Sequence, residues 1–138
     1  PIGLMGAKGE AADTLLPGDH ASTFGGNPVV CGAATAVLQV LLEEGFLARV
    51  TKLGNYFMAK LRELDYQGIV EVRGLGLIIG LEIAGDGAKV AKLCQEQGLL
   101  VNCIAGKTLR FLPPLIIEEE HIDLAVSVLQ KALSMIEK

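Results

Sequence analysis

The sequence predicts an α+β fold, in which helices cover one face of a small, mostly antiparallel sheet. Apolar residues recur every three or four positions from Phe46 to Leu64, as in an amphipathic helix. Residues 69–84 and 99–112 instead alternate or form short apolar runs bounded by glycine and proline, as strands do. With 138 residues, the chain is long enough to bury a core of its own.

The first part of the chain is expected to be a loop followed by a helix. Residues 1–27 are rich in glycine and show little periodicity. Asn27 is a candidate N-cap and Pro28 suits the first helical position, so the apolar stretch that ends at Leu42 should be helical. Because this helix is apolar on nearly every side, we expect it to be buried on nearly every side. Gly45 should separate it from the next helix.

The remaining elements follow in order along the chain. The helix after Gly45 should carry its basic side chains off the apolar stripe, on a solvated face: Arg49, Lys52, Lys60 and Arg62. Strands are expected over 69–73 and 77–84, a helix over 88–97, strands over 99–104 and 108–112, and a last helix from residue 115 onward. The first turn of that helix contains three glutamates that complement the helix dipole: Glu118, Glu119 and Glu120.

Composition excludes several classes of function. A net charge of −4 with 4% aromatic residues and no Trp argues against nucleic acid or an anionic membrane as the partner. The longest apolar run, 29–42, is interrupted and too short to span a bilayer. Cys31, Cys94 and Cys103 are odd in number and form no C-x-x-C pair, which indicates neither a disulfide framework nor a zinc site. We therefore expect a cytoplasmic protein without a metal centre.

Two motifs that suggest chemistry are weak. "VRGLGLIIG" has the spacing G-x-G-x-x-x-G and leads into a strand, whereas a dinucleotide site needs a helix N-terminus there. We interpret its glycines as a tight turn and a close strand contact. Asp19 and His20 beside Ser22 resemble parts of a hydrolase triad, but adjacent loop residues point apart and no G-x-S-x-G elbow is present. His121 falls in the last helix, where exposure is expected.

The segment "DHASTFGGNP" allows two interpretations. Ser22 and Thr23 offer hydroxyls next to glycines and a helix N-terminus, which suits a phosphate group. The same residues also describe an ordinary helix entry, with Gly25-Gly26 as the turn and Asn27 as the cap. Composition alone favours the helix entry.

Arg110 also allows two interpretations. In "TLRFL", alternation places Arg110 on the face opposite Leu109 and Phe111. One possibility is an ion pair with a local carboxylate such as Glu82. The other is a guanidinium fork that binds a substrate carboxylate with two hydrogen bonds. Spacing alone favours the ion pair.

Taken together, these motifs resemble the class III pyridoxal-phosphate aminotransferases. "HASTFGGNPVVCGAATAVLQVL" is similar to the family's H-x-[ST]-T-[FY]-x-G-N-P segment, and "VEVRGLGLIIGLEI" resembles its strand pair after the linking helices. "LRFLPPLIIEEEHID" resembles the arginine-bearing strand and final helix, and "PIG" the stretch after the cofactor-binding lysine. The resemblance covers essentially the whole chain in the right order. It is greatest to the family's enzymes for N-acetylornithine, with those for ornithine close behind.

The resemblance implies where the chain belongs in the fold. It implies a fold-type I transferase, with 1–45 as the end of the large cofactor-binding domain and the start of a linking helix. Residues 46–138 would be the C-terminal small domain. The lysine that forms the Schiff base would lie upstream of "PIG", and Lys8, which follows that segment, is not it. We therefore expect no catalytic residue in this chain, and the chain alone should be inactive.

The resemblance also implies a cofactor, pyridoxal 5'-phosphate, and roles for three residues. Thr23 would hydrogen-bond the cofactor phosphate across the interface of a homodimer with shared active sites. Ser22 would touch the substrate or share the phosphate, and Arg110 would bind the α-carboxylate of the amino acid or 2-oxo acid.

The implied reaction moves an amino group from N-acetylornithine, or an ornithine-like donor, to 2-oxoglutarate in arginine biosynthesis. Three alternatives use the same scaffold. One is an aminotransferase for ornithine or another ω-amino acid. The second is an aminomutase or decarboxylase, and the third is a non-catalytic binding or dimerisation module.

Overall fold

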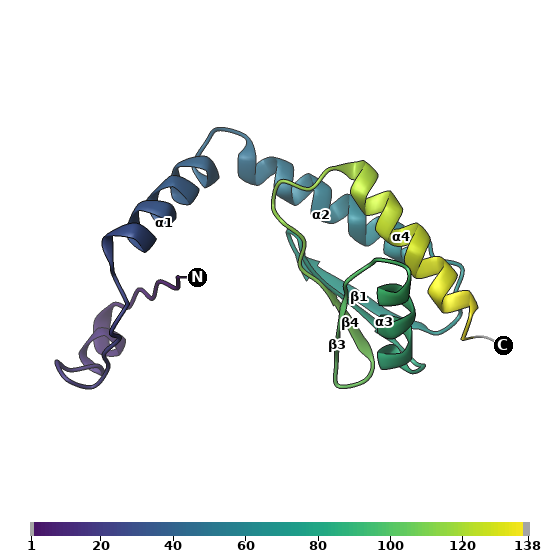
Figure 1. The fold of residues 1–138 in the computed structure, drawn as a ribbon, viewed down its shortest axis with the longest axis horizontal. Coiled ribbons are helices and arrows are strands. Elements are labelled where there is room, and N and C mark those ends of the chain that lie inside the picture. The colour runs from purple at the N-terminus through teal and green to yellow at the C-terminus, as the bar shows by residue number, and fades with distance from the viewer. Residues whose placement is uncertain (1, 137–138) are drawn as a thin grey trace. The chain divides into compact units, whose positions relative to one another are not determined.

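The computed structural model describes residues 2–136 and divides the chain into two compact units, Pro1–Phe46 and Leu47–Lys138. Figure 1 shows the order of the elements along the chain. They are the 3-10 helix η1 (Gly9–Asp13), the helices α1 (Pro28–Leu41), α2 (Phe46–Arg62), α3 (Gly87–Glu96) and α4 (Glu119–Ser134), and the strands β1 (Ile69–Leu75), β2 (Ile78–Ile83), β3 (Asn102–Ile104) and β4 (Thr108–Phe111). No single helix within residues 2–136 has the length and apolar character of a membrane span.

The first unit is built around α1, and its N-terminus forms as predicted. The Asn27 side chain accepts a hydrogen bond from Val30 N at 3.1 Å, and Pro28 occupies the first turn. Gly45, with φ +83°, lies in the break before α2. Gly9–Asp13 forms a 3-10 turn within the expected loop. No residue of α1 is buried within this chain, so the burial expected on nearly every side would need contacts outside it and stays a prediction.

The second unit contains a four-stranded sheet in the order β1-β2-β4-β3, with every neighbouring pair antiparallel. Leu81 on β2 lies opposite Leu109 on β4, and both are fully buried. Because successive side chains alternate, the residues between them point to the other face. Phe111 meets Phe57 of α2 edge to face, with ring centroids 5.1 Å apart. The helices therefore cover one face of the sheet, and the predicted α+β arrangement is confirmed.

Most boundaries agree with the prediction within about two residues, but two elements begin later than expected, each for a local reason. The strand expected over 99–104 is confined to β3, because the chain leaves α3 through a turn in which Leu99 N donates to Cys94 O at 2.9 Å. The last helix begins at Glu119 instead of Leu115. The residues before it form a turn closed by Ile117 N and Pro114 O at 3.1 Å.

We predicted that the basic side chains of α2 would only face solvent, but two of them also form hydrogen bonds to distant parts of the chain. Arg49 donates to the carbonyls of Leu115 at 3.3 Å and Ile117 at 2.7 Å, and so fixes the turn that leads into α4. Arg62 donates to Val72 O on β1 at 3.1 Å. These bonds attach α2 to segments far away in the sequence, and the basic residues have this structural role in addition to their exposure.

A backbone contact sets the distance between α2 and the β1–β2 turn. Gly54 faces Gly76, and a Cβ added to Gly54 would overlap the Gly76 carbonyl. Gly76 itself has φ +55°, in the left-handed region that favours glycine. A Cβ at Gly74 would lie 2.5 Å from Ile78 O. The interpretation of these glycines as a tight turn with a close strand contact is confirmed.

Gly54→Ala should destabilise the protein by about 1–3 kcal/mol, because the added methyl forces α2 away from the turn. The measurement is the free energy of unfolding from urea titration. Thr51→Ala, on the exposed side of the same helix, is the control and should change this free energy by no more than about 0.5 kcal/mol. Equal effects of the two substitutions would contradict the close contact.

All three cysteines are free thiols, and only Cys94 is fully buried. Burial raises the pKa of the Cys94 thiol to about 11. At about pH 8 only about one Cys94 in a thousand would be a thiolate, the form that reacts. Cys94 is therefore part of the core and is not a candidate nucleophile.

Cys94 should not react with Ellman's reagent in the native protein and should react after unfolding in guanidinium. The check compares the wild type with Cys94→Ala by counting reactive thiols. The variant should give the same native count and one thiol fewer after unfolding. A native count that falls by one in the variant would show that Cys94 is accessible.

Candidate functional site

The residues expected to bind anions fall in both units of the chain. Ser22 and Thr23 belong to the unit Pro1–Phe46, and Arg110 belongs to the unit Leu47–Lys138. Each group is held by hydrogen bonds or strand pairing within its own unit.

The loop before α1 is shaped by its own side chains. Ser22 Oγ accepts a hydrogen bond from Gly25 N at 3.1 Å. Asn27 Nδ2 donates to Phe24 O at 2.7 Å, while its Oδ1 caps the helix at Val30. The helix-entry interpretation of this segment is therefore confirmed. It does not exclude an anion site, because both hydroxyls lie in the loop that leads into a 14-residue helix.

The donors exposed in this loop suit a phosphate group. Thr23 is exposed, and its hydroxyl makes no hydrogen bond to any residue within 2–136. The Ser22 hydroxyl is used as an acceptor, so its hydrogen is still available for donation. Asp19 Oδ2 accepts from Leu16 N at 2.8 Å, so this carboxylate is engaged in the preceding turn rather than paired with His20. The loop therefore offers hydroxyl donors a few residues before the positive end of α1.

Arg110 lies on the uncovered face of the sheet. In the strand register Arg110 is opposite Gly80 on one side and Asn102 on the other, and Gly80 is opposite Arg73. Gly80 carries no side chain, so the two arginines flank an open position. Arg110 also lines a cavity of about 360 Å³. The cavity is lined by Gln95, Leu100, Val101, Asn102, Arg110 and Leu112.

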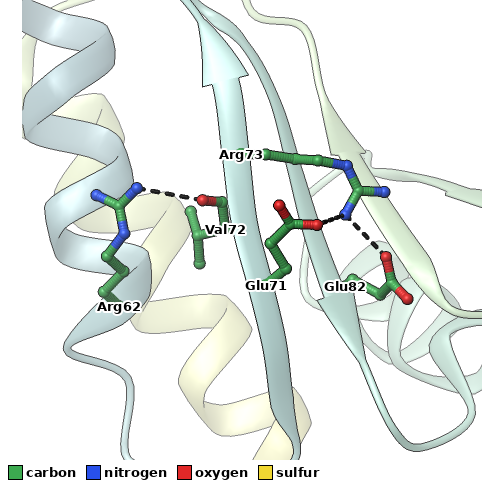
Figure 2. A network of polar contacts seen from close by, with 5 residues as sticks. All are labelled: Arg62, Glu71, Val72, Arg73 and Glu82. Atoms are coloured by element: carbon green, nitrogen blue, oxygen red, sulfur yellow. Dashed lines mark hydrogen bonds and ion pairs between the residues drawn. The ribbon is translucent and has the colours of Figure 1, made fainter.

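The ion pair expected between Arg110 and Glu82 does not form. Glu82 instead accepts from Arg73 Nη1 at 2.8 Å, and Glu71 accepts from the same nitrogen at 2.6 Å (Figure 2). These hydrogen bonds, first that to Glu82 and then that to Glu71, raise the pKa of Arg73. No carboxylate within residues 2–136 forms a salt bridge with Arg110.

The pairing register of β1 and β2 explains why Glu82 forms its ion pair with Arg73. Glu71 and Glu82 lie directly opposite each other on β1 and β2, and like charges in that position repel. Arg73, two residues along β1 on the same face, bridges both carboxylates (Figure 2). The alternation of Glu71 and Arg73 along β1 could have indicated this network, but the sequence analysis considered Glu82 only as a partner for Arg110.

A second group of ligating atoms lies at the start of α4. Carboxylate and imidazole atoms of Glu118, Glu120 and His121 lie within 4.8 Å of one another, and all three residues are exposed. The positive end of the helix dipole opposes a cation there. Glu119 and Glu120 lie in the first turn, where they complement the dipole as expected, whereas Glu118 is the N-cap residue and its side chain makes no capping bond. Glu119 also reaches Lys52 of α2 at 3.6 Å.

The aminotransferase class-III family model matches residues 1–133. The chain is 46% identical over 136 residues to the acetylornithine aminotransferase of Methanothermobacter thermautotrophicus, covering 97% of this chain and 35% of that protein. It is 50% identical over 133 residues to the enzyme of the same name from Aquifex aeolicus, covering 96% of this chain and 34% of that protein. The chain thus spans about a third of the length of the curated relatives it matches.

Solved structures give the same result for the fold. The acetylornithine aminotransferase of Elizabethkingia anophelis matches with a TM-score of 0.77 and 34% identity, over 91% of this chain and 34% of that one. An ornithine aminotransferase from Toxoplasma gondii, described with partial occupancy of PLP at its active site, matches with a TM-score of 0.77 and 36% identity over 94% of this chain and 32% of that one. The predicted resemblance and fold class are confirmed, and the family implies pyridoxal phosphate as cofactor. The chain belongs to the class III aminotransferases.

Proposed function

We propose that this chain serves a pyridoxal-phosphate-dependent aminotransferase that moves an amino group from N-acetylornithine to 2-oxoglutarate in arginine biosynthesis. The observation that carries the proposal is the state of Arg110, which is exposed beside a cavity and has no carboxylate partner within residues 2–136. Relatives named acetylornithine aminotransferase support the choice of donor. An ornithine donor is the second candidate, supported by the 42% identical ornithine aminotransferase of Staphylococcus aureus.

Arg110 would bind the α-carboxylate that the amino donor and the 2-oxo acceptor share. A guanidinium presents paired N–H donors in a plane that matches a carboxylate. Because β4 is held between β2 and β3, the base of this side chain is fixed by strand pairing on both sides. Binding the carboxylate at a fixed point orients the rest of the substrate for reaction.

Thr23 and Ser22 would hold the phosphate group of the cofactor, with Ser22 also free to touch substrate. Pyridoxal phosphate, when bound, supplies an electron sink for breaking bonds at the amino-bearing carbon. The lysine that carries it would lie upstream of residue 1, so this chain would bind and orient, and would move no proton itself. In this proposal residues 1–45 close the large domain and 46–138 form the small domain.

The exposed apolar side of α1 supports a homodimer in which each subunit completes its partner's site. Val29 is 81% exposed, Val37 57% and Leu38 51%. Clusters of exposed apolar side chains on a protein surface often mark a site of contact with another protein. A groove of about 450 Å³ runs along the same helix. It is lined by Ile2, Gly3, Leu4, Val29, Val30, Ala33, Ala34, Val37 and Leu38. The free cysteines agree with a cytoplasmic location.

Arg110→Ala in the full-length enzyme should weaken transfer from every α-carboxylate substrate, by about 2–5 kcal/mol if the pair with the carboxylate is fully desolvated in the complete site. The measurement is kcat/KM for the amino donor and for 2-oxoglutarate. Lys92→Ala, an exposed cation on α3, is the control and should leave kcat/KM unchanged. Unaltered kinetics of Arg110→Ala together with a lower melting temperature would assign Arg110 a structural role only.

Thr23→Ala should weaken cofactor binding by about 1.5–3 kcal/mol, the usual scale of a hydrogen bond to a charged group. The dissociation constant of pyridoxal phosphate, titrated into the apoenzyme and followed by absorbance, tests this. Thr51→Ala, far along the sequence on α2, serves as the matched threonine control. A Thr23→Ala enzyme that titrates like the wild type would remove Thr23 from the phosphate site.

A further inference from the structure

We propose that Arg73 is a positioning residue that keeps Arg110 available for the substrate carboxylate. It does so by holding Glu82, the carboxylate that would otherwise pair with Arg110. The inference rests on the proposed role of Arg110 and adds a residue that never touches the substrate.

The strand register puts Glu82 within reach of Arg110. Gly80 is opposite Arg110 and Glu82 is opposite Thr108, so Glu82 and Arg110 are diagonal neighbours on the same face of the sheet. Long side chains at diagonal positions of antiparallel strands can touch. Gly80 adds no side chain that would separate them.

Arg73 competes for Glu82 from the other side of Gly80. Its stem runs beside this glycine, since a Cβ added to Gly80 would lie 3.9 Å from Arg73 Cγ. Its Nη1 then reaches Glu82 at 2.8 Å and Glu71 at 2.6 Å (Figure 2). One cation thus neutralises two carboxylates that would repel each other.

Removal of this cation would change the partner of Glu82. Two opposed carboxylates would remain on β1 and β2, and the other arginine on this face is Arg110. Glu82 can turn toward Arg110 from the adjacent strand. Glu71 is two strands away from Arg110 and faces it only across β2. A released Glu82 would therefore compete with the substrate carboxylate, while a released Glu71 would not.

This difference between the two glutamates gives a matched test in the full-length holoenzyme. Arg73→Met keeps the apolar stem and removes the charge. We expect it to raise the KM for 2-oxoglutarate about two- to fivefold, the scale of a half-exposed ion pair, with kcat unchanged. The dissociation constant of 2-oxoglutarate from calorimetry should rise by the same factor.

A second substitution in the Arg73→Met enzyme distinguishes competition by Glu82 for Arg110 from a general loss of structure. Adding Glu82→Gln to Arg73→Met should restore both constants, whereas adding Glu71→Gln should not. Arg73→Lys, which keeps a cation between the carboxylates, should behave like the wild type. An Arg73→Met enzyme with wild-type constants, or equal rescue by the two glutamine substitutions, would overturn the inference.

The Arg110→Ala enzyme distinguishes this failure from failure of the proposed function. If Arg110→Ala weakens 2-oxoglutarate binding and Arg73→Met does not, only the role of Arg73 is wrong. If Arg110→Ala has no effect on binding, the proposed function fails and the role of Arg73 fails with it.

Discussion

The packing of β2 and β4 against the helices decides what the rest of the second unit can do. Leu81 and Leu109 face each other on these central strands and are fully buried. Strand alternation then leaves the neighbouring residues on the opposite face, where Arg110 is exposed. Arg110 is exposed because the residues on either side of it, Leu109 and Phe111, are buried in the core. A one-residue shift in register would bury the guanidinium and expose the leucine.

Charge on the uncovered face is distributed by the same alternation. Glu71, Arg73 and Glu82 form a closed network, and Arg110 stands outside it (Figure 2). These side chains are partly exposed, so each bond contributes little to stability by itself. The network matters because it pairs Glu82 with Arg73 and so leaves Arg110 outside these ion pairs.

Much of this fold could be predicted from the sequence, because its signals are local. The stripe from Phe46 to Leu64, the cap at Asn27 and the alternation around Arg110 each depend on neighbouring residues, and the structure agrees with them. What was missed depends on contacts across the fold. The bonds from Arg49 to the segment before α4 join residues more than sixty positions apart. The partner of Glu82 depended on strand pairing, which composition and spacing do not report.

The candidate site also has features that the sequence predicts locally and features that depend on contacts in the folded chain. The motif around Thr23 and the face of Arg110 were visible in the sequence, but the availability of each group depends on what surrounding side chains bind. Ser22 could be assigned to a turn only once its bond to Gly25 was seen. The family membership came from motif order along the chain and from the comparisons, since neither unit alone contains all of the segments.

The segment between Leu16 and Val30 is held by short-range hydrogen bonds to the side chains of Asp19, Ser22 and Asn27. A segment so tied has already lost most of its conformational freedom when the chain folds. If Ser22 and Thr23 bind an anion, as proposed, a loop already held by these hydrogen bonds would lose little further conformational freedom on binding. Tight retention of a small phosphate ester is therefore compatible with a surface loop of only a few hydroxyl and amide donors.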